Sequence, residues 1–268
     1  MVYDYLGRED SPFSGDVWQK LDEVVIGAAS GQLSARRLLD IEGPYGLGLK
    51  SIPLQDEIDV SDNVRLISSE VLPLSLIETT FTLGVRDLAT FTETGFALDT
   101  GAIAEAAMAV AAVEDTIIFE GNEKIGVDGL LTTDGVQSVA LSKWDDIGTA
   151  ANDVIKAVTT LDEAGFHGPY MLALAPNLYN MLYRLYPQGY QIEIQHIETV
   201  VGSKIIKAPG IKKGGVLLSS GKQFASIVIG QDMRTSFVGP EDSDFKFKIS
   251  ESLVPRIRVP ASVCVLKA

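Results

Sequence analysis

Residues 36–46 read Arg-Arg-Leu-Leu-Asp-Ile-Glu-Gly-Pro-Tyr-Gly, and they separate a helical segment from a long β-rich one. The stretch follows an N-terminal amphipathic helix and contains a short strand. It ends in a turn where Gly43 and Gly46 tolerate positive φ and Pro44 restricts φ. The stretch is therefore predicted to set the angle between the N-terminal helix and the β segment.

The composition is that of a globular protein. The chain has 268 residues, of which 46% are hydrophobic and 22% charged, enough for one large domain or two modest ones. No apolar run is long enough for a bilayer and no signal-peptide pattern begins the chain, so we expect a cytoplasmic protein without membrane contact. The single Cys264 excludes an intramolecular disulfide, and two histidines leave too few ligands for a zinc site.

The charge is negative and unevenly spread. A net charge of -14 argues against nucleic-acid binding, because phosphate contacts dominate that affinity. Residues 51–134 hold 3 Lys/Arg against 16 Asp/Glu, which gives -13 of the -14. This segment is interpreted either as an ordinary solvated acidic face or as a surface for basic residues of a neighbouring subunit.

The N-terminal third is predicted to contain an arm, a helix and a β hairpin. Residues 1–13 show no periodicity, and Ser14 is expected to cap a helix with one apolar stripe (Val17, Leu21, Val24, Val25 and Ala28). Residues 47–83 read as β, with a turn at Asp62-Asn63. A lone two-stranded arm is marginal in water, so we expect this one to rest on another subunit.

The rest of the chain mixes helices and strands. An alanine-rich helix is predicted at 99–120, with Ile103, Ala106, Val110, Val113 and Ile117 on one face and Gly121 after its end. A second helix is expected at 144–164, with Ser142 and Asp145 in a capping box. A strand at 170–174 and a helix at 176–185 make 142–210 an α/β unit. Strands are expected at 216–218, 226–229, 245–249 and 262–266.

No catalytic constellation is visible. His167 and His196 lack positioned partners, and the pairs Asp145-Asp146 and Asp242 with Asp244 are spaced as solvated neighbours. Residues 215–223 resemble a phosphate loop, but the glycine spacing is one too long and Gln223 replaces the hydroxyl residue, so they are interpreted as a strand and turn. The profile favours assembly over catalysis, and a hydrolase or peptidase remains as an alternative.

Several short motifs, in their order and spacing, resemble the encapsulin family of self-assembling protein shells. The first is Ile-Glu-Gly-Pro-Tyr-Gly at 41–46. The others extend over nearly the whole chain: Leu72-Pro73-Leu74, Phe81-Thr82-Leu83, Glu114-Asp115, Ile118-Phe119-Glu120-Gly121, Gly126 with Gly129-Leu130-Leu131, Gly168-Pro169-Tyr170 and Ile229-Gly230-Gln231-Asp232.

The resemblance implies an α+β chain with the HK97-type phage capsid fold, which has a peripheral domain, an extended loop (E-loop) and an axial domain. The expected boundaries are 1–46 for the N-terminal arm, helix and start of the peripheral domain, 47–83 for the extended β loop, 84–135 for the peripheral domain with its spine helix, 136–225 for the axial domain, and 226–268 for the C-terminal strands of the peripheral domain.

The implied function is a non-catalytic shell subunit. About 60 subunits, or more in a larger shell, would form an icosahedral nanocompartment around a cargo enzyme. Cargo such as a peroxidase or a ferritin-like protein would link the shell to oxidative stress or iron storage. A terminal targeting peptide of the cargo would dock on residues that equally suit core or interface contacts: Val17, Leu21, Val25, Arg36, Asp40, Gln231, Asp232 and Met233.

Two further expectations concern solute entry and cofactors. The five-fold pore is implied to be lined by Pro187, Gln188, Gly189, Tyr190 and Gln191. These residues are uncharged, so electrostatic filtering is expected at other openings. Some family members bind a flavin, which Trp18 and Trp144 could stack, but lone tryptophans are more often core anchors and no cofactor is expected.

The nearest alternative of the same fold is a phage-type major capsid protein that packages DNA. The amphipathic helix near residues 17–28 suits peptide docking, and a long charged scaffolding segment is absent from the sequence. The sequence therefore favours an enzyme-enclosing shell over a DNA-packaging capsid.

Overall fold

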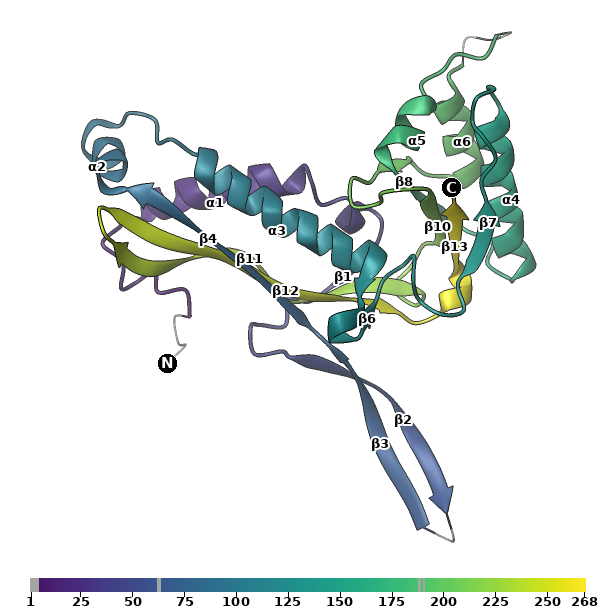
Figure 1. Ribbon diagram of the computed structural model, residues 1–268, viewed down its shortest axis with the longest axis horizontal. Helices are drawn as coiled ribbons and strands as arrows, with labels where there is room; N and C mark the ends of the chain where they lie inside the picture. Colours follow the sequence, from purple (N-terminus) through teal and green to yellow (C-terminus); the bar gives the residue numbers. More distant parts are fainter. Residues whose placement is uncertain (1–4, 62–63, 188, 190) are drawn as a thin grey trace.

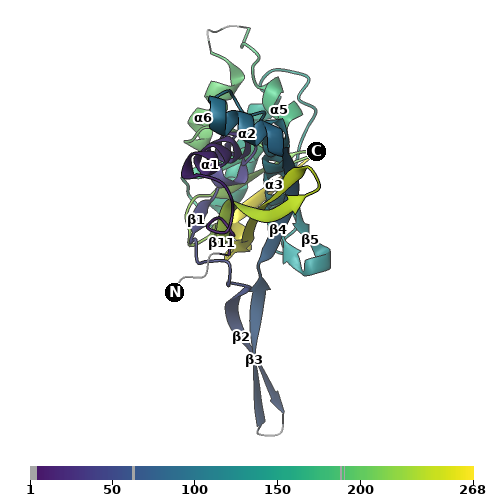
Figure 2. The same ribbon diagram turned by 90° about the vertical axis from the view of Figure 1, so that its left-hand side faces the viewer.

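Figure 1 shows the computed structural model, which describes residues 5–61, 64–187, 189 and 191–268. The chain forms an elongated body with a sheet and helices at each end and a two-stranded arm that extends from its middle. Figure 2, turned by 90°, shows that the arm points away from the body and that α1 and α3 lie close together. The molecule is α+β, as the sequence predicts.

The first sheet has the strand order β1-β11-β12-β4, with β1 parallel to β11 and the other pairs antiparallel. Helices α1 and α3 pack on one of its faces. The elements are α1 (Gly15–Ser30), β1 (Asp40–Glu42), β4 (Ser75–Gly84), α3 (Gly101–Glu120), β11 (Ala225–Glu241) and β12 (Asp244–Ile257). Strands β11 and β12 are much longer than their apolar runs suggested, because polar residues continue the ladder beyond them.

Helix α1 buries its apolar stripe in the main core, and Val17, Leu21 and Val25 are at most 3% exposed. Its first turn is anchored by an aromatic cluster in which Phe13 packs edge-on against Phe237 and Phe245. The helix begins after Ser14 as predicted, but the Ser14 side chain makes no capping hydrogen bond.

Helix α3 is the predicted spine helix, and its small alanines let α1 and the sheet approach closely. Val113 was placed in the buried stripe, but it is 46% exposed. The buried face instead runs through Ala107, Ala111 and Ile118, because the packed arc of the helix is wider than one 3.6-residue stripe.

The arm consists of β2 (Ser51–Ser61) and β3 (Val64–Pro73), paired antiparallel as predicted. The predicted turn at Asp62-Asn63 lies outside the described residues. Strand β4, which the sequence boundaries placed in the extended loop, pairs with β12 in the first sheet. Its alternate residues Ile77, Phe81 and Leu83 are buried, so the strand has a core face that the arm lacks.

The second sheet has the order β7-β13-β10-β8-β9 and carries its own core under α4 and α6. Alternate residues of β10 serve two cores, because Val216 and Leu218 pack in the first and Leu217 in the second. The elements are β7 (Gln137–Ala140), α4 (Thr149–Glu163), β8 (Tyr170–Leu174), α5 (Pro176–Met181), α6 (Glu193–Val201), β9 (Ile206–Lys207), β10 (Gly215–Ser219) and β13 (Val263–Lys267).

Two expectations for this end of the molecule were wrong. The capping box does not form, because α4 begins only at Thr149 and Ser142 donates instead to the buried Asp153, with both N and Oγ at 2.7 Å. Strand β13 was grouped with the peripheral strands, but it lies between β7 and β10. Its apolar run, Val263 to Leu266, is buried on both faces and needs the second core.

The remaining short elements were not predicted individually. They connect the two sheets or cover the ends of the first one. They are the 3₁₀ turn η1 (Ala35–Arg37), α2 (Val85–Thr94), β5 (Gly121–Asn122), η2 (Glu123–Ile125), β6 (Val127–Asp128) and η3 (Pro260–Ser262).

Candidate functional site

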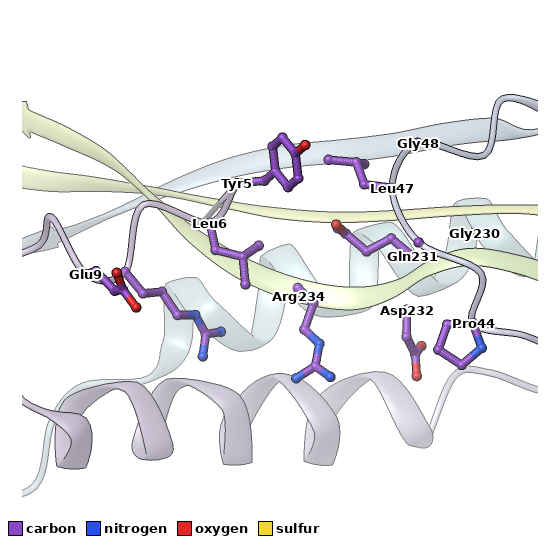
Figure 3. A pocket seen from close by; sticks show the side chains of 12 residues that line it. Tyr5, Leu6, Glu9, Pro44, Leu47, Gly48, Gly230, Gln231, Asp232 and Arg234 are labelled. Atoms are coloured by element: carbon purple, nitrogen blue, oxygen red, sulfur yellow. The ribbon is translucent and has the colours of Figure 1, made fainter. Parts of the chain in front are cut away.

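An open cleft of about 820 Å³ lies along the outer edge of β11 (Figure 3). Its walls come from three segments: the N-terminal residues 5–9, the loop after β1, and the middle of β11. In Figure 3, Asp232 and Arg234 extend from β11 toward the α1 side of the cleft. The lining residues are Tyr5, Leu6, Arg8, Glu9, Pro44, Gly46, Leu47, Gly48, Gly230, Gln231, Asp232 and Arg234.

The walls of the cleft are hydrogen-bonded to β11 on both sides of it. Strand β1 pairs with Ser226 to Val228, and the loop after it continues along β11, where the Tyr45 amide donates to the Ile229 carbonyl at 3.0 Å and the Gly46 amide to the Gly230 carbonyl at 2.5 Å. On the other side, Leu6 O accepts from Phe237 N at 2.8 Å. Register shifts at Gln231 and Arg234 bend the strand along the cleft.

The turn at 43–46 holds the loop wall in place. Gly43 and Gly46 adopt φ of 108° and 103°, as the sequence predicts. A Cβ at residue 43 would collide with the carbonyl of Ile229, so only glycine permits this close approach to β11.

Arg8 fixes the N-terminal wall. Its guanidinium makes two hydrogen bonds to Asp22 at 2.7 and 2.8 Å, lies 4.5 Å from the Trp18 ring centroid, and donates from Nε to Thr235 O at 3.0 Å. Bidentate arginine–carboxylate contacts are geometrically specific. One side chain thus ties the N-terminal segment to both α1 and β11.

Below the cleft floor, Arg36 binds three carboxylates from three different elements. Its Nε and Nη2 donate to Glu114 of α3 at 2.7 and 2.8 Å, Nη2 also donates to Glu251 of β12 at 3.0 Å, and Nη1 donates to Asp232 at 2.7 Å. Glu114 and Glu251 are fully buried, whereas the Asp232 side chain is 49% exposed. We call these four residues the Arg36 cluster.

The turn that carries Arg36 is itself anchored on α3. The buried Asp115 accepts hydrogen bonds from the backbone amides of Ser34 and Ala35, both at 3.0 Å, and from the Ser34 hydroxyl. This carboxylate caps η1, so the position of Arg36 follows from the spine helix.

Protonation in the Arg36 cluster is strongly perturbed. Burial and the neighbouring Glu114 carboxylate raise the pKa of Glu251 to about 10, so Glu251 is protonated at neutral pH. Burial acts against ionisation of Asp232, but the hydrogen bond from Arg36 lowers the pKa of Asp232 below its usual value. The cluster therefore keeps the exposed Asp232 charged and oriented in the cleft.

The structure brings together part of the predicted docking set. Arg36 and Asp232 form an ion pair, Gln231 and Asp232 line the cleft, and the half-buried Met233 packs on the main core beside them. Val17, Leu21 and Val25 lie in the core with no surface to offer a peptide, so they support the cleft from below. Asp40 is exposed at the start of β1 and does not line the cleft.

Sequence reasoning did not assign a site role to Glu114 or Glu251. One signal was available for Glu251. Residues two apart on a strand point to the same face, so Glu251 shares the core face of Ile249 and Leu253. A buried acid needs a partner, which would have pointed to Arg36.

The predicted pore loop belongs to the connection between α5 and α6. Tyr186 N donates to Gln191 O and Gly189 N to Tyr186 O, both at 3.2 Å, so the loop folds back on itself. Pro187, Gly189 and Gln191 are exposed, and Gln188 and Tyr190 lie outside the described residues.

The tryptophans do not fit a stacked flavin. Trp18 is 7% exposed and has Arg8 over its ring with Phe247 at 5.9 Å, and Trp144 is 3% exposed and donates from Nε1 to Asp153 at 3.1 Å. Both indoles are thus fully engaged in packing and hydrogen bonding.

In the described part of the chain, no helix is long and apolar enough to cross a membrane.

The spine helix over a long-stranded sheet, the protruding arm and the second domain define the HK97-type capsid fold. A virus-like particle from Pyrococcus furiosus has the same fold, with a TM-score of 0.76 and 24% identity over 94% of this chain and 100% of that one. The capsid of Myoviridae phage XM1 matches with a TM-score of 0.64 and 11% identity, over 87% of this chain and 91% of that one.

The chain belongs to the encapsulin family, because the Linocin_M18 family model, described as "Encapsulating protein for peroxidase", matches residues 3–254. It is similar to the type 1 encapsulin shell protein EncA of Myxococcus xanthus, with 30% identity over 98% of this chain and 96% of that one. It also resembles a diheme-cytochrome–encapsulin shell fusion protein of Kuenenia stuttgartiensis, with 30% identity over 93% of this chain and 72% of the relative. The protein is thus a structural shell subunit and not an enzyme.

Proposed function

We propose that this chain closes into an icosahedral shell of about 60 or more copies. The shell is located in the cytoplasm and encloses a cargo protein. The description of the family names a peroxidase as the encapsulated protein, and a relative from Pyrococcus furiosus is a ferritin-like–encapsulin shell fusion protein. A peroxidase or a ferritin-like protein is therefore the proposed cargo class.

We further propose that the cargo presents a terminal peptide to the β11 cleft. The observation that carries this proposal is the open cleft of about 820 Å³ that runs along β11 from Gly230 to Arg234. An extended peptide can add to a strand edge through its main chain while its side chains enter neighbouring pockets. Leu6, Leu47 and Pro44 supply apolar surface, and Gln231, Asp232 and Arg234 supply polar anchors.

The shell is tested first, by electron microscopy of the purified protein. Closed particles of uniform diameter are expected, and small oligomers or amorphous aggregates would contradict the shell.

The docking site is tested by Leu47→Asp, which places a charge on the apolar wall of the cleft. Loading of a co-expressed cargo is expected to fall at least about tenfold, because an aspartate in an apolar contact costs more than about 1.4 kcal/mol.

The matched control is Val238→Asp, which places the same charge on β11 outside the cleft, at a side chain that is 54% exposed. Cargo per shell is measured by gel densitometry of sized particles. Unchanged loading of intact Leu47→Asp shells would exclude this cleft. Leu21→Asp is not informative, because Leu21 is fully buried and the change would disrupt the core.

The loop at 187–191 is proposed to line the five-fold opening of the shell. The exposed residue Gln191 carries no charge. We expect Gln191→Asp to change the entry rates of small anions and cations less than about threefold, because most ions are proposed to enter through other openings, and a charge at this loop is screened beyond a Debye length of about 10 Å. Stopped-flow quenching of an encapsulated fluorophore by iodide and by thallium ions measures this. A large, sign-dependent change would assign the filter to this loop.

A further inference from the structure

Arg256, near the end of β12, is a partly buried cation that makes no ion pair with a described residue. In the described part of the chain its guanidinium makes no hydrogen bond or ion pair, and its buried Nε has no acceptor. An arginine held away from water without a partner is unfavourable, so such a group generally marks a contact that a single chain does not complete.

Arg256 differs from the other partly buried lysines and arginines among the described residues, because each of those pairs with a carboxylate of its own chain. These pairs are Arg8 with Asp22, Lys20 with Glu23, Arg36 with Glu114, Arg184 with Glu193, Lys246 with Glu241, Lys248 with Glu78, and Arg258 with Glu42. Arg256 is the exception within this set.

Arg256 faces open space at the base of the arm. Three adjoining cavities of about 510, 200 and 190 Å³ all have Arg256 on their walls, together with residues of β2 or β3. Two of the cavities are also lined by Glu70, which makes no ion pair with Arg256. Glu42 is nearby but is already bound to Arg258 at 2.7 Å. We call this region the arm-base seat.

The arm carries the opposite charge and has no partner of its own. In the β2–β3 register, Glu57 lies opposite Ser68 and Asp59 opposite Leu66, so the two carboxylates share one face of the hairpin. Both are exposed and neither makes an ion pair with a described residue, and Leu66 beside them is 65% exposed. This face combines two unpaired acids with an uncovered apolar side chain.

We propose that the arm-base seat receives the Glu57–Asp59 face of the arm of a second copy of this chain. The proposal rests on the proposed shell, in which every arm meets a neighbouring subunit. The seat offers a cation that needs an acid, and the arm offers acids and apolar surface that need cover. Each subunit then gives one arm and receives one, and a symmetric assembly satisfies every Arg256.

The test reverses the charges on each side and then on both. Arg256→Glu removes the seat cation, and Glu57→Lys with Asp59→Lys reverses the arm. Each change alone is expected to lower the fraction of protein in closed shells at least about tenfold at low salt, because like charges then meet in the contact. The triple variant restores opposite charges and is expected to recover shells to within about threefold of the wild type.

Lys143→Glu is the matched control, since Lys143 is exposed and lies outside the seat. Glu70→Gln tests whether Arg256 instead contacts Glu70 of its own arm. If Glu70→Gln lost its shells while the Glu57→Lys, Asp59→Lys variant kept them, Arg256 would be assigned to its own arm. Shell fraction is measured by mass photometry and negative-stain microscopy, and circular dichroism confirms that each subunit is folded.

Normal assembly of Arg256→Glu, or failure of the triple variant to recover while its subunits remain folded, would overturn the proposed contact. Absence of shells in the wild type would instead overturn the proposed function. Recovery in the triple variant cannot arise from general destabilisation, because it adds two substitutions to an impaired chain.

Discussion

Replacing Arg36 by methionine is expected to destabilise the fold by about 3–5 kcal/mol, the usual result of removing one partner from a buried ion pair. Methionine keeps the unbranched apolar part of the side chain and removes the guanidinium with its five donors. Glu114 and Glu251, both fully buried, would lose their hydrogen bonds to the guanidinium. The exposed Asp232 would lose its anchor and can turn to water, so most of the loss comes from the two buried acids.

Arg37→Met is the control, because Arg37 is the adjacent residue in the same turn but is exposed and makes no ion pair with a described residue. We expect it to change stability by less than about 0.5 kcal/mol. Urea unfolding of dissociated subunits, followed by the fluorescence of the two buried tryptophans, measures both variants. Equal midpoints for Arg36→Met and Arg37→Met would show that the Arg36 cluster contributes nothing to folding.

The Arg36 cluster also connects the site to the framework of the subunit. Arg36 follows the N-terminal helix, Glu114 belongs to the spine helix, and Glu251 and Asp232 belong to adjacent strands. A change at Arg36 would therefore alter both the core and the Asp232 wall of the cleft. Separating docking from stability requires cleft variants such as Leu47→Asp, whose side chain is not part of the cluster.

Periodic and turn signals predicted much of the fold. The apolar stripe of α1, the glycine after α3, the β arm and strand β8 follow from local patterns, because each pattern depends on neighbours in sequence. The family boundaries could not show that β4 and β13 pair in sheets away from their sequence neighbours. Those pairings depend on which core can bury residues such as Phe81 and Cys264, and this is a tertiary property.

The site was less predictable than the fold. Arg36, Gln231 and Asp232 were identified through the family resemblance, and the structure places them together. The same apolar stripe that suggested a groove at Val17, Leu21 and Val25 proved to be core, because a groove and a core require the same residue types. Glu251 is 215 residues away from Arg36 in sequence, so only the folded chain brings the two side chains together.

Glu251→Gln is expected to stabilise the protein at alkaline pH relative to the wild type. The folded-state pKa of Glu251 is about 10, raised by burial and by Glu114 from an ordinary value of 4.5. Glutamine has the same shape and needs no proton. Its carbonyl can accept from Arg36 as Glu251 Oε2 does.

The sign of the pH effect follows from proton counting. Between pH 4.5 and about 10 the folded wild type holds a proton on Glu251 that the unfolded chain has released. Wild-type stability therefore falls as pH rises through this window, by about 1.4 kcal/mol per pH unit for one proton. The variant lacks this contribution, so its advantage should grow by about 3 kcal/mol between about pH 6 and 8.

Urea midpoints at a series of pH values measure that difference, with Glu78→Gln as the control. Glu78 lies on the neighbouring strand opposite Ser250, and its side chain is 48% exposed. Its ion-pair partner is Lys248 at 3.2 Å, at the surface, so this control shows whether removing any strand carboxylate gives the same pH dependence. A constant difference between Glu251→Gln and the wild type across pH would show that Glu251 is ionised in the fold. Arg36 would then balance three carboxylate charges, and the Arg36→Met defect would exceed the range given above.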